Sequence, residues 1–512
     1  MSSTFSWNRF SGVLNKMPKS AARSGSAAAL FAVLAGGWIG ALSTDAYALD
    51  LDWSGQFRSE ANFLLGYGLG SSADATEVNG GYTIPGGGKK DAVFESVFLK
   101  LRPKVIVNDN IAIKSELWAG DPVYGFFGSA VPGTIDRRQY YSNQSGGGQF
   151  SAQRYYAEFL SDIGTVVIGR APLHWGLGMI WNASPDNLWD RYPTTGDTIR
   201  LVSKLGAFTF IPSIVRYSTD NSISSGRGLD EYSIAFRYEN PEEDFEAGVN
   251  LIRRLGSSIQ GAGGYLSPMT DSTGGVNTTT WDLYGRKRFG KLSVGLEVPI
   301  QNGTVDNVTA SAVAAAVEAD WRATDSLEFN LRGGYAPGQP SSTSDPSTYN
   351  AFYFHPDYRL GLILFNYQLA NISGPSTQND PSTAASSLKS PYDSPIVNAK
   401  YLTVGSKVSL EKWDLRGKLI FALADQVAKS GKKFLNTWER RMVDNAAGID
   451  QGGYLGTELD FGVSFKWDDS FSFHADGGWL IPGEFYAFSN DAGVTNPTQS
   501  MFAASFKVGV NF

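Results

Sequence analysis

The sequence predicts an all-β fold, a transmembrane antiparallel β-barrel of about 18 strands with short periplasmic turns and long extracellular loops. Three observations lead to this prediction. Apolar residues alternate with polar or small ones along the whole chain, the connections are alternately short and long, and the N-terminus resembles a secretion signal. The final segment, MFAASFKVGVNF, shows the alternation clearly, because every second residue from Phe502 to Phe512 is apolar.

Residues 1–48 have the pattern of a signal peptide. Basic residues precede an apolar run over 27–42, and the tripeptide at 46–48 supplies the small residues that a signal peptidase recognises. We therefore expect cleavage after Ala48, which leaves 49–512 as the barrel. A retained anchor is the alternative, although the run is short for a membrane span. The sequence leaves open which methionine, Met1 or Met17, starts translation.

The same alternation in the segments 413–423 and 454–467 predicts which side chains face lipid. Parity places Leu419 and Phe461 on the outer face and the charged residues between them on the lumen face. In the second of these segments, the outward set is expected to begin at Leu455.

Turn and loop patterns give the strand count. Eight tight turns alternate with nine longer connections, so about 18 strands are required and both chain ends lie on the tight-turn side. The tight turns are expected at 108–110, 161–164, 204–206, 239–244, 288–291, 323–326, 410–413 and 467–470. The longer connections are expected at 68–90, 119–148, 171–195, 257–276, 338–395, 428–453 and 482–497, with shorter ones near 219–228 and 302–306. The final segment is then the closing strand and pairs with the first strand over 51–63, since an open edge cannot lie in lipid.

One apolar segment, 358–369, has no place in this wall. A nineteenth strand would put the chain ends on opposite sides of the membrane, so we assign the segment to the loop 338–395. Its large apolar side chains cannot remain in water, so we expect them on the inner wall, on the stretch 169–200 or on a neighbouring subunit. Both 169–200 and 338–395 are expected to fold over or into the lumen.

Composition excludes several classes of function. The chain has 512 residues and no cysteine, which rules out disulfides and thiolate metal sites. His174, His355 and His474 lack zinc-ligand spacing, so no metal or other cofactor is predicted. The formal net charge of −7 argues against nucleic acid as a partner.

The most distinctive stretch is GRAPLHWGLGMIWNASPDNLWDRYPTTGDTIR, over 169–200. It resembles the G-R-x-P-x-x-W-G-L-G signature of an outer-membrane β-barrel family from predatory and social deltaproteobacteria. More loosely, it is similar to alginate-export and capsule-assembly barrels and to porins. FHPDYR, at 354–359, also resembles the first family, and the likeness covers about the middle two-thirds of the chain.

The resemblance implies the outer membrane of a Gram-negative bacterium, with lipid and lipopolysaccharide around the barrel. It also implies that the outer-membrane assembly machinery recognises the C-terminal strand ending in Phe512. The sequence leaves monomer and homotrimer both open.

Three interpretations of the stretch 169–200 remain. As a constriction, its opposed charges would set a transverse field across the pore. The residues of this constriction would be Arg170, Asp186, Asp190, Arg191, Asp197, Arg200, Asp357 and Arg359. As a sugar site, it would stack pyranose rings on Trp175, Trp181, Trp189 and Tyr192. In the third interpretation, the stretch packs against the wall and its ion pairs are structural.

Strand parity also predicts charges along the lumen wall, which would mostly form cross-strand pairs. They are Lys100, Arg102, Lys104, Glu116, Arg286, Arg288, Glu318, Asp320, Glu328, Arg332, Arg416 and Lys418. Because both signs occur, strong ion selectivity does not follow. His474 and Asp476 share a lumen face, but no partner serine can be assigned, so no catalytic residue and no enzyme activity is predicted.

The sequence thus predicts a porin-like channel for passive diffusion of small hydrophilic solutes. A surface barrel that binds, exports or assembles polysaccharide, plugged by its own loops, is the alternative.

Overall fold

The computed structural model describes residues 50–66, 69, 91–120, 150–183, 189–217, 229–256, 275–305, 308–367, 369, 395–436, 441–490, 492–493 and 495–512. Asp50–Phe512 forms one compact unit. The predicted signal peptide and its cleavage site lie outside the described residues, so they stay predictions.

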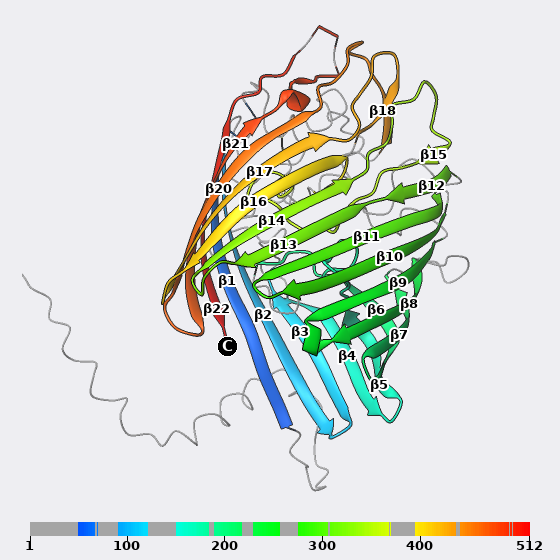
Figure 1. Cartoon of the computed structure of the whole chain (residues 1–512), viewed down its shortest axis with the longest axis vertical. Helices are drawn as coiled ribbons and strands as arrows, with labels where there is room; N and C mark the ends of the chain where they lie inside the picture. The colour runs from blue at the N-terminus through cyan, green and yellow to red at the C-terminus, as the bar shows by residue number, and fades with distance from the viewer. Residues whose placement is uncertain are drawn as a thin grey trace, which may run out of the picture. The chain divides into compact units, whose positions relative to one another are not determined.

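Long antiparallel strands form the wall of this unit (Figure 1). The wall segments are β1 (Asp50–Leu65), β2 (Ala92–Asn108), β3 (Ile111–Ala119), β4 (Phe150–Ser161), β5 (Gly164–Pro172), β6 (Thr195–Leu205), β7 (Phe208–Arg216), β8 (Asp230–Asn240), β9 (Phe245–Gly256), β10 (Val276–Phe289), β11 (Leu292–Val305), β12 (Val308–Val313), β13 (Ala315–Arg322), β14 (Leu327–Ala336), β16 (Ala399–Ser409), β17 (Trp413–Ala424), β20 (Tyr454–Lys466), β21 (Phe471–Pro482) and β22 (Met501–Asn511). Outside the wall are β15 (Thr348–Tyr349), the hairpin of β18 (Lys433–Asn436) and β19 (Arg441–Asp444), and two short 3-10 helices, Pro241–Glu243 and Glu484–Ala487.

β12 and β13 are two halves of one wall strand, because both pair with β11. The break falls at Ala314, beside Pro299 of β11, and proline has no N–H to donate to the ladder. Counted this way, the described residues form a closed wall of 18 strands, as predicted.

The closing seam lies between β1 and β22, whose register runs from Gln56↔Asn511 to Leu65↔Phe502. Phe512 N donates to Gly55 O at 3.0 Å, and Gly55 N donates to Phe512 O at 2.7 Å. The Phe512 ring covers Gly55, where a Cβ would stand 2.3 Å from it. The predicted closing strand is therefore confirmed, and its end lies beside β1 (Figure 1).

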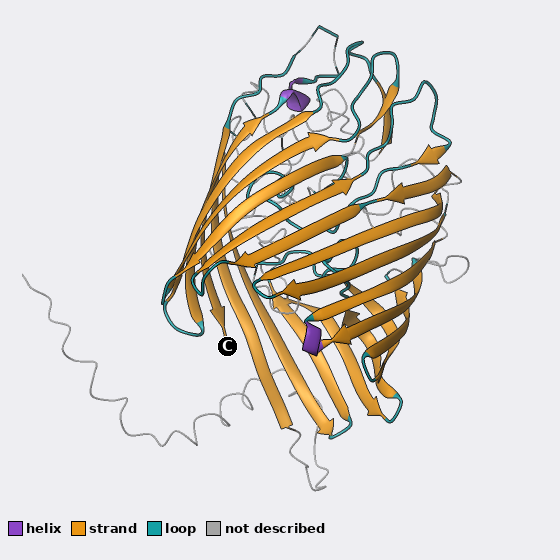
Figure 2. Ribbon diagram, viewed as in Figure 1, coloured by secondary structure: helices purple, strands orange, loops and turns teal. Residues whose placement is uncertain are grey.

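The eight predicted tight turns are confirmed as the eight hairpins of one rim, and the described parts of the longer connections lie on the opposite rim (Figure 2). Segment 358–369 is not part of the wall, because β14 pairs directly with β16.

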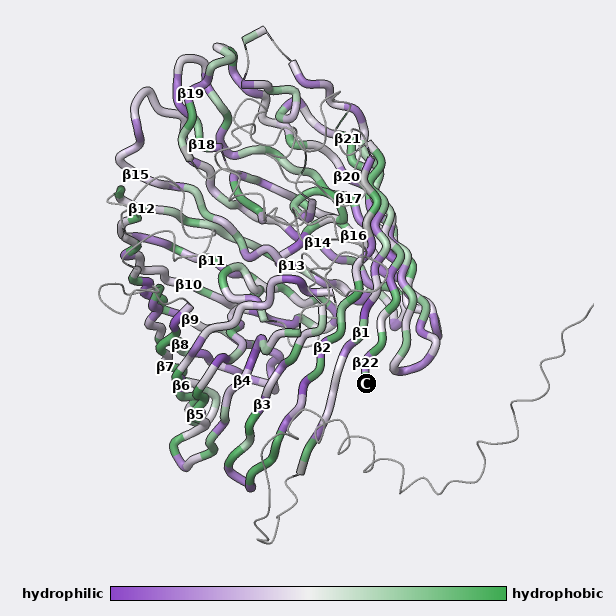
Figure 3. The backbone as a smooth tube through the Cα atoms, turned by 180° about the vertical axis from the view of Figure 1, so that it is seen from behind, coloured by the Kyte–Doolittle hydropathy of each residue, from purple (hydrophilic) through white to green (hydrophobic). Residues whose placement is uncertain are grey.

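Most of the exposed large apolar side chains lie on the outside of the wall, whereas polar and charged side chains are buried inside it. Hydrophilic and hydrophobic residues are interspersed along the strands (Figure 3). Phe461 is 60% exposed on the outer face, whereas Glu297 and Glu458 are fully buried inside. Near the tight-turn rim, outward aromatic rings pack across strands, for example Trp413 against Phe465 at 4.6 Å between centroids. Such girdles mark the edge of the lipid-facing band in membrane barrels.

The expectation for Leu455 is wrong. Its side chain is 4% exposed and packs in the lumen cluster instead of facing outward. The register between β17 and β20 shifts at this point, where Ala422 opposes Gly456 and Leu423 opposes Tyr454. Gly456 has a φ of +139°. A β-bulge adds one residue to the strand and reverses the parity beyond it.

Candidate functional site

Loop 173–194, of which residues 173–183 and 189–194 are described, contacts two remote parts of the wall. Leu177 N and Met179 N both donate to the carboxylate of Glu297 on β11. At its other end, the carbonyl of Asp190 accepts a hydrogen bond at 2.9 Å from Arg58 on β1. β1 and β11 lie on opposite sides of the ring of strands. The loop therefore crosses the lumen.

A second segment, 350–367, is bound to the inner face of β20. Ile363 N and Leu364 N donate to Glu458 at 2.7 and 2.6 Å. Leu362 N donates to Asp460 at 3.0 Å. Wall carboxylates thus hold both inserted segments by their backbone N–H groups.

Apolar packing holds the same segment against the inner wall. Leu360, Ile363 and Leu364 are at most 1% exposed, and they pack in one cluster with wall residues such as Ile420 and Leu480. Of the three places expected for these side chains, the structure shows two. They pack on the inner wall and on residues of the stretch 169–200 such as Met179, which belongs to the same cluster.

The seam between β1 and β22 also contacts this segment. Asn62 Oδ1 accepts hydrogen bonds from Tyr367 Oη at 3.2 Å and from Ser505 Oγ at 2.9 Å. One wall side chain therefore joins the closing strand to the inserted segment.

The two insertions bind each other at a junction formed by residues 189–192 and 355–359. Asp357 accepts hydrogen bonds from Arg191 N at 3.0 Å and from Tyr192 N at 2.6 Å. Arg359 forms an ion pair with Asp357 and donates to Trp189 O at 3.1 Å. The Arg191 side chain continues the network to the wall, with 2.7 Å between its Nη2 and Glu60 Oε2.

The two carboxyl groups at the junction have opposite pKa shifts. Burial, together with the nearby Asp357, raises the pKa of Asp190 to about 7. Burial alone would also raise the pKa of Asp357. However, the positive charge of Arg359 and the hydrogen bonds that the Asp357 carboxylate accepts hold the pKa of Asp357 below its ordinary value. Burial lowers the pKa of His355 to about 4, so its imidazole is neutral at neutral pH.

The structure brings four of the eight predicted constriction residues together at this junction: Asp190, Arg191, Asp357 and Arg359. Asp186 lies outside the described residues. Arg200 faces inward on β6 but hydrogen-bonds to Pro172 O at 3.1 Å, apart from the junction. The sequence analysis missed the roles of Glu297 and Glu60, which bind Leu177 N and Arg191. The available signal was an isolated acidic residue at an inward position of an apolar strand, as in VGLEVP.

The predictions for Arg170 and Asp197 are wrong. The two side chains pair bidentately at 2.8 and 3.1 Å, and they lie on the outer face with Ile168 and Ile199, which are 44% and 57% exposed. The reason is parity, because both residues belong to wall strands, β5 and β6, and occupy outward positions there. Asp197 also lies opposite Arg216 of β7, so the pair extends a row of charges along the outer rim.

The aromatic residues of the stretch do not form one stacking surface. Trp175 is 5% exposed and packs on the wall with Ile252 and Tyr284. Trp189 lies edge-on to His474, with 5.2 Å between ring centroids. Trp181 and Tyr192 both line a cavity of about 460 Å³.

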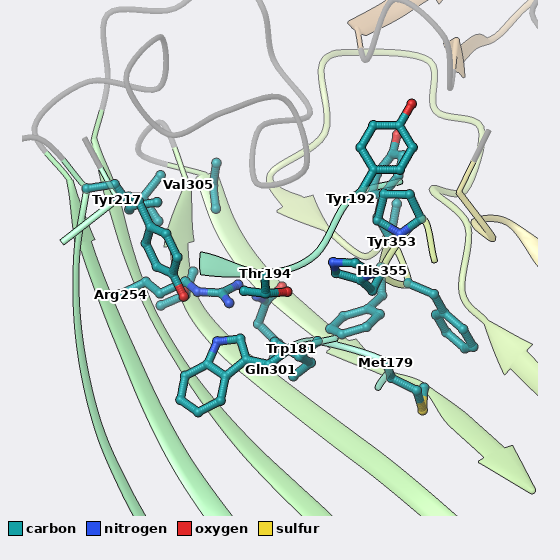
Figure 4. A pocket seen from close by; sticks show the side chains of 18 of the residues that line it. Met179, Trp181, Tyr192, Thr194, Tyr217, Arg254, Gln301, Val305, Tyr353 and His355 are labelled. Atoms are coloured by element: carbon teal, nitrogen blue, oxygen red, sulfur yellow. The ribbon is translucent and has the colours of Figure 1, made fainter. Parts of the chain in front are cut away.

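This cavity lies between loop 173–194, segment 350–356 and the outer ends of β9–β11 (Figure 4). Its lining is rich in aromatic rings and hydroxyl groups. It includes Trp181, Tyr192, Thr194, Tyr217, Arg254, Thr278, Gln301, Phe352, Tyr353 and His355. Two smaller cavities, of about 260 and 220 Å³, lie nearer the tight-turn rim and are lined mainly by polar and charged wall residues.

His474 has serine partners that the sequence could not assign. Ser464 Oγ lies 2.8 Å from its Nδ1, and Ser472 Oγ lies 3.0 Å from its Nε2. The nearby Asp476 is bonded to Arg416 and Lys507 instead of to the imidazole. A Ser-His-Asp triad needs a carboxylate that orients the imidazole ring. This arrangement is therefore not such a triad.

Comparison with known proteins bears on the fold. No protein-family model and no curated protein matches the chain. Among solved structures, OccK2 (OpdF) of Pseudomonas aeruginosa in complex with glucuronate has a TM-score of 0.50 at 7% identity, covering 90% of this chain and 98% of that one. The barrel has the fold of an outer-membrane porin.

Two further porin-fold structures are less similar. A BenF-like porin from Pseudomonas fluorescens Pf-5 has a TM-score of 0.47 at 10% identity, covering 90% of this chain and 98% of its own. OprD of P. aeruginosa has a TM-score of 0.46 at 8% identity, with 90% and 95% covered. The resemblance to the deltaproteobacterial family stays a prediction.

Proposed function

We propose that this chain is a porin-like channel of the Gram-negative outer membrane that passes small hydrophilic solutes by passive diffusion. The observation that carries the proposal is the junction of two wall-anchored insertions inside a lumen lined with charges. An 18-strand barrel encloses a lumen wider than side chains can fill. A channel for small solutes needs such a lumen to be narrowed, and the two insertions, which are bonded to the inner face of the wall, would narrow it.

The wall charges favour filtering by size over filtering by charge. Glu116 pairs with both Arg102 and Arg154, at 2.9 and 3.1 Å. Asp476 pairs with both Arg416 and Lys507, at 2.9 and 3.0 Å. Because the charges compensate one another along the wall, they give a passing ion no strong preference by sign.

Single-channel recording tests the proposal. Folded protein, purified in detergent and added to a planar lipid bilayer in concentrated KCl, should give discrete conductance steps. The steps should be much smaller than those of an unobstructed barrel of equal strand number. In liposome swelling, uptake should fall steeply as the solute becomes larger. A correctly folded, inserted protein that gives neither steps nor swelling would contradict the proposal.

The proposal includes the partners that follow from an outer-membrane location. Lipid and lipopolysaccharide would contact the apolar outer face, and the assembly machinery would recognise β22 with its terminal Phe512. Cross-linking of the folded protein in outer-membrane vesicles separates a homotrimer from a monomer.

The alternative, a surface barrel for polysaccharide, is favoured by one observation, the aromatic lining of the 460 Å³ cavity. A barrel of this kind that is plugged by its loops would bind saccharide without conducting ions, which the same recordings would show.

A further inference from the structure

We propose that the 460 Å³ cavity, lined by Trp181, Thr278 and their neighbours, binds a neutral saccharide of one or two rings. This inference rests on the proposed channel function, because it gives the substrate class that would be bound before passage. The volume of the cavity falls within the range of about 300–1,000 Å³ that is usual for small-molecule sites.

Neutrality follows from the charges around the cavity. Among the described lining residues, Arg254 is the one permanent charge, and its Nε is 2.6 Å from the Glu231 carboxylate. Tyr217 Oη adds a hydrogen bond to the same carboxylate at 3.2 Å. His355 accepts a hydrogen bond from Asp357 N at 3.1 Å through Nδ1 and is buried as the neutral imidazole. A charged ligand would therefore lose its hydration without gaining a counter-charge.

Aromatic rings supply flat apolar faces on more than one side of the cavity. The Trp181 indole lies at its base, with Tyr217 on one side and Tyr192, Tyr353 and His355 on the other (Figure 4). Sugar rings have apolar C–H faces and polar edges, so they fit between aromatic faces that are separated by hydroxyl groups. An open-chain polyol has the hydroxyl groups without a flat face, and an apolar ring has the face without the hydroxyl groups.

One buried hydroxyl group of the lining has no hydrogen-bond partner in the part of the chain that the structure describes. Thr278 on β10 is 2% exposed, and among the described residues its Oγ1 has no partner. A buried polar group without a partner destabilises the folded state, because it has lost its hydration without gaining a hydrogen bond. A ligand hydroxyl would remove that cost, so the site is already prepared for a hydrogen-bonding ligand. Gln301, from β11, lines the same side of the cavity.

The site would be reached from the long-loop side before the junction. Thr278, Arg254 and Gln301 all lie near the ends of their strands that face the long loops. Met179, which also lines the cavity, is bonded through its N–H to Glu297 and through its carbonyl to His355 N at 2.8 Å. The base of the cavity is thus part of the insertion that narrows the lumen.

Isothermal titration calorimetry on the detergent-solubilised, folded protein tests the inference independently of ion conduction. Maltose is the neutral two-ring probe, glucuronate the charged ring and sorbitol the open chain. We expect maltose to bind more tightly than either of the other two. Thr278→Val should weaken maltose binding by about three- to tenfold, the worth of one hydrogen bond.

Thr403→Val is the matched control. Thr403 is also fully buried on a wall strand, and among the described residues its Oγ1 has no partner either, but it does not line the cavity. Its replacement should leave maltose binding unchanged. The proposed site would be overturned if the protein bound the three probes with equal affinity. It would also be overturned if Thr278→Val and Thr403→Val changed maltose binding equally in variants that keep the folded gel band. Conductance steps in that same protein would still uphold the channel, whereas silent bilayers with tight maltose binding would uphold the site and contradict the channel.

Discussion

Arg170 and Arg191 belong to the same charged stretch of sequence, yet they lie on opposite faces of the wall. Arg170 is on the outer face of β5, paired with Asp197. Arg191 is 5% exposed inside the lumen and binds Glu60. Only the second can act on a passing ion.

Ion selectivity should separate the two arginines. Arg191→Gln removes a positive charge from the junction and leaves Glu60 with Arg58, so permeation should shift toward cations. A unit charge a few ångströms from an ion in water changes its energy by about 1 kcal/mol, which predicts a shift of about three- to fivefold in the permeability ratio. Arg170→Gln should leave the ratio unchanged. Reversal potentials in a KCl gradient measure both, and equal shifts would contradict the outward placement of Arg170.

Asp190 should make the junction sensitive to pH near neutrality. Because its folded pKa of about 7 lies above its ordinary value of 3.8, the folded state holds this proton more tightly than the unfolded chain. Its contribution to stability is therefore present at low pH and is lost as the pH rises from about 4 through about 7. Deprotonation puts a second negative charge beside Asp357, although Arg359, Lys100 and Arg58 partly compensate it.

We therefore expect conductance and current noise to increase as the pH rises through about 7, with Asp190→Asn constant across that interval. Recordings at stepped pH values measure this dependence. A wild-type response that persists in Asp190→Asn would assign the titration to another group.

At single positions, sequence parity succeeded where the strand was regular and failed where it was not. The charges of β17 and the outward position of Phe461 followed from alternation alone. Leu455 did not, because a bulge reverses parity and no residue type announces it except a glycine such as Gly456. The prediction for Arg170 fails for a different reason, because it follows the charge pattern of the stretch 169–200 and not the parity of the wall strand.

Among the elements, the hairpins were predictable and the insertions were not. Tight turns carry local signals such as NDN and RFGK, and each fixes two neighbouring strands. The path of segment 350–367 depends on Glu458 and Asp460, about a hundred positions away in the sequence. The strand count could exclude this segment from the wall, but only the folded barrel shows which carboxylates hold it.

Deleting residues 350–370 should raise single-channel conductance and leave the heat-resistant folded band intact. The segment supplies no wall strand, because the partner of β14 is β16, so the ladder survives its loss. Its removal takes away the junction and the apolar cluster within the lumen. Gel mobility with and without boiling, followed by bilayer recording, measures both effects. Loss of the folded band would show that the segment is needed for the wall itself.

For the whole molecule, the distribution of apolar and charged side chains shows which solvent suits the outer surface of the barrel. Large apolar side chains cover the outside, among them Ile199, Phe461 and Phe506 at 57%, 60% and 56% exposure. Carboxylates such as Asp282 and Glu458 are fully buried inside. A surface of this kind is stable in lipid and not in water.

Phe461→Arg should destabilise the folded barrel by about 2–4 kcal/mol if the position is near mid-bilayer. Glu328→Gln, on the lumen side of β14, should change stability little, since water can reach the replaced group. Urea titrations of protein folded into lipid vesicles give both values. Equal losses would mean that the two side chains share one environment.

Asn62 links the rate of folding to the contents of the lumen. Ser505 is 443 positions away from it along the chain and Tyr367 is 305 away, yet both donate to its side-chain oxygen. Contacts between such remote residues form slowly, because long stretches of chain must first be brought together. Asn62 can meet Ser505 only when the last strand joins the first. Pairing of the last strand with the first would therefore close the barrel and complete the contacts of Asn62 at the same stage of folding. A folding intermediate whose two edge strands are still unpaired should be permeable to solutes until they pair.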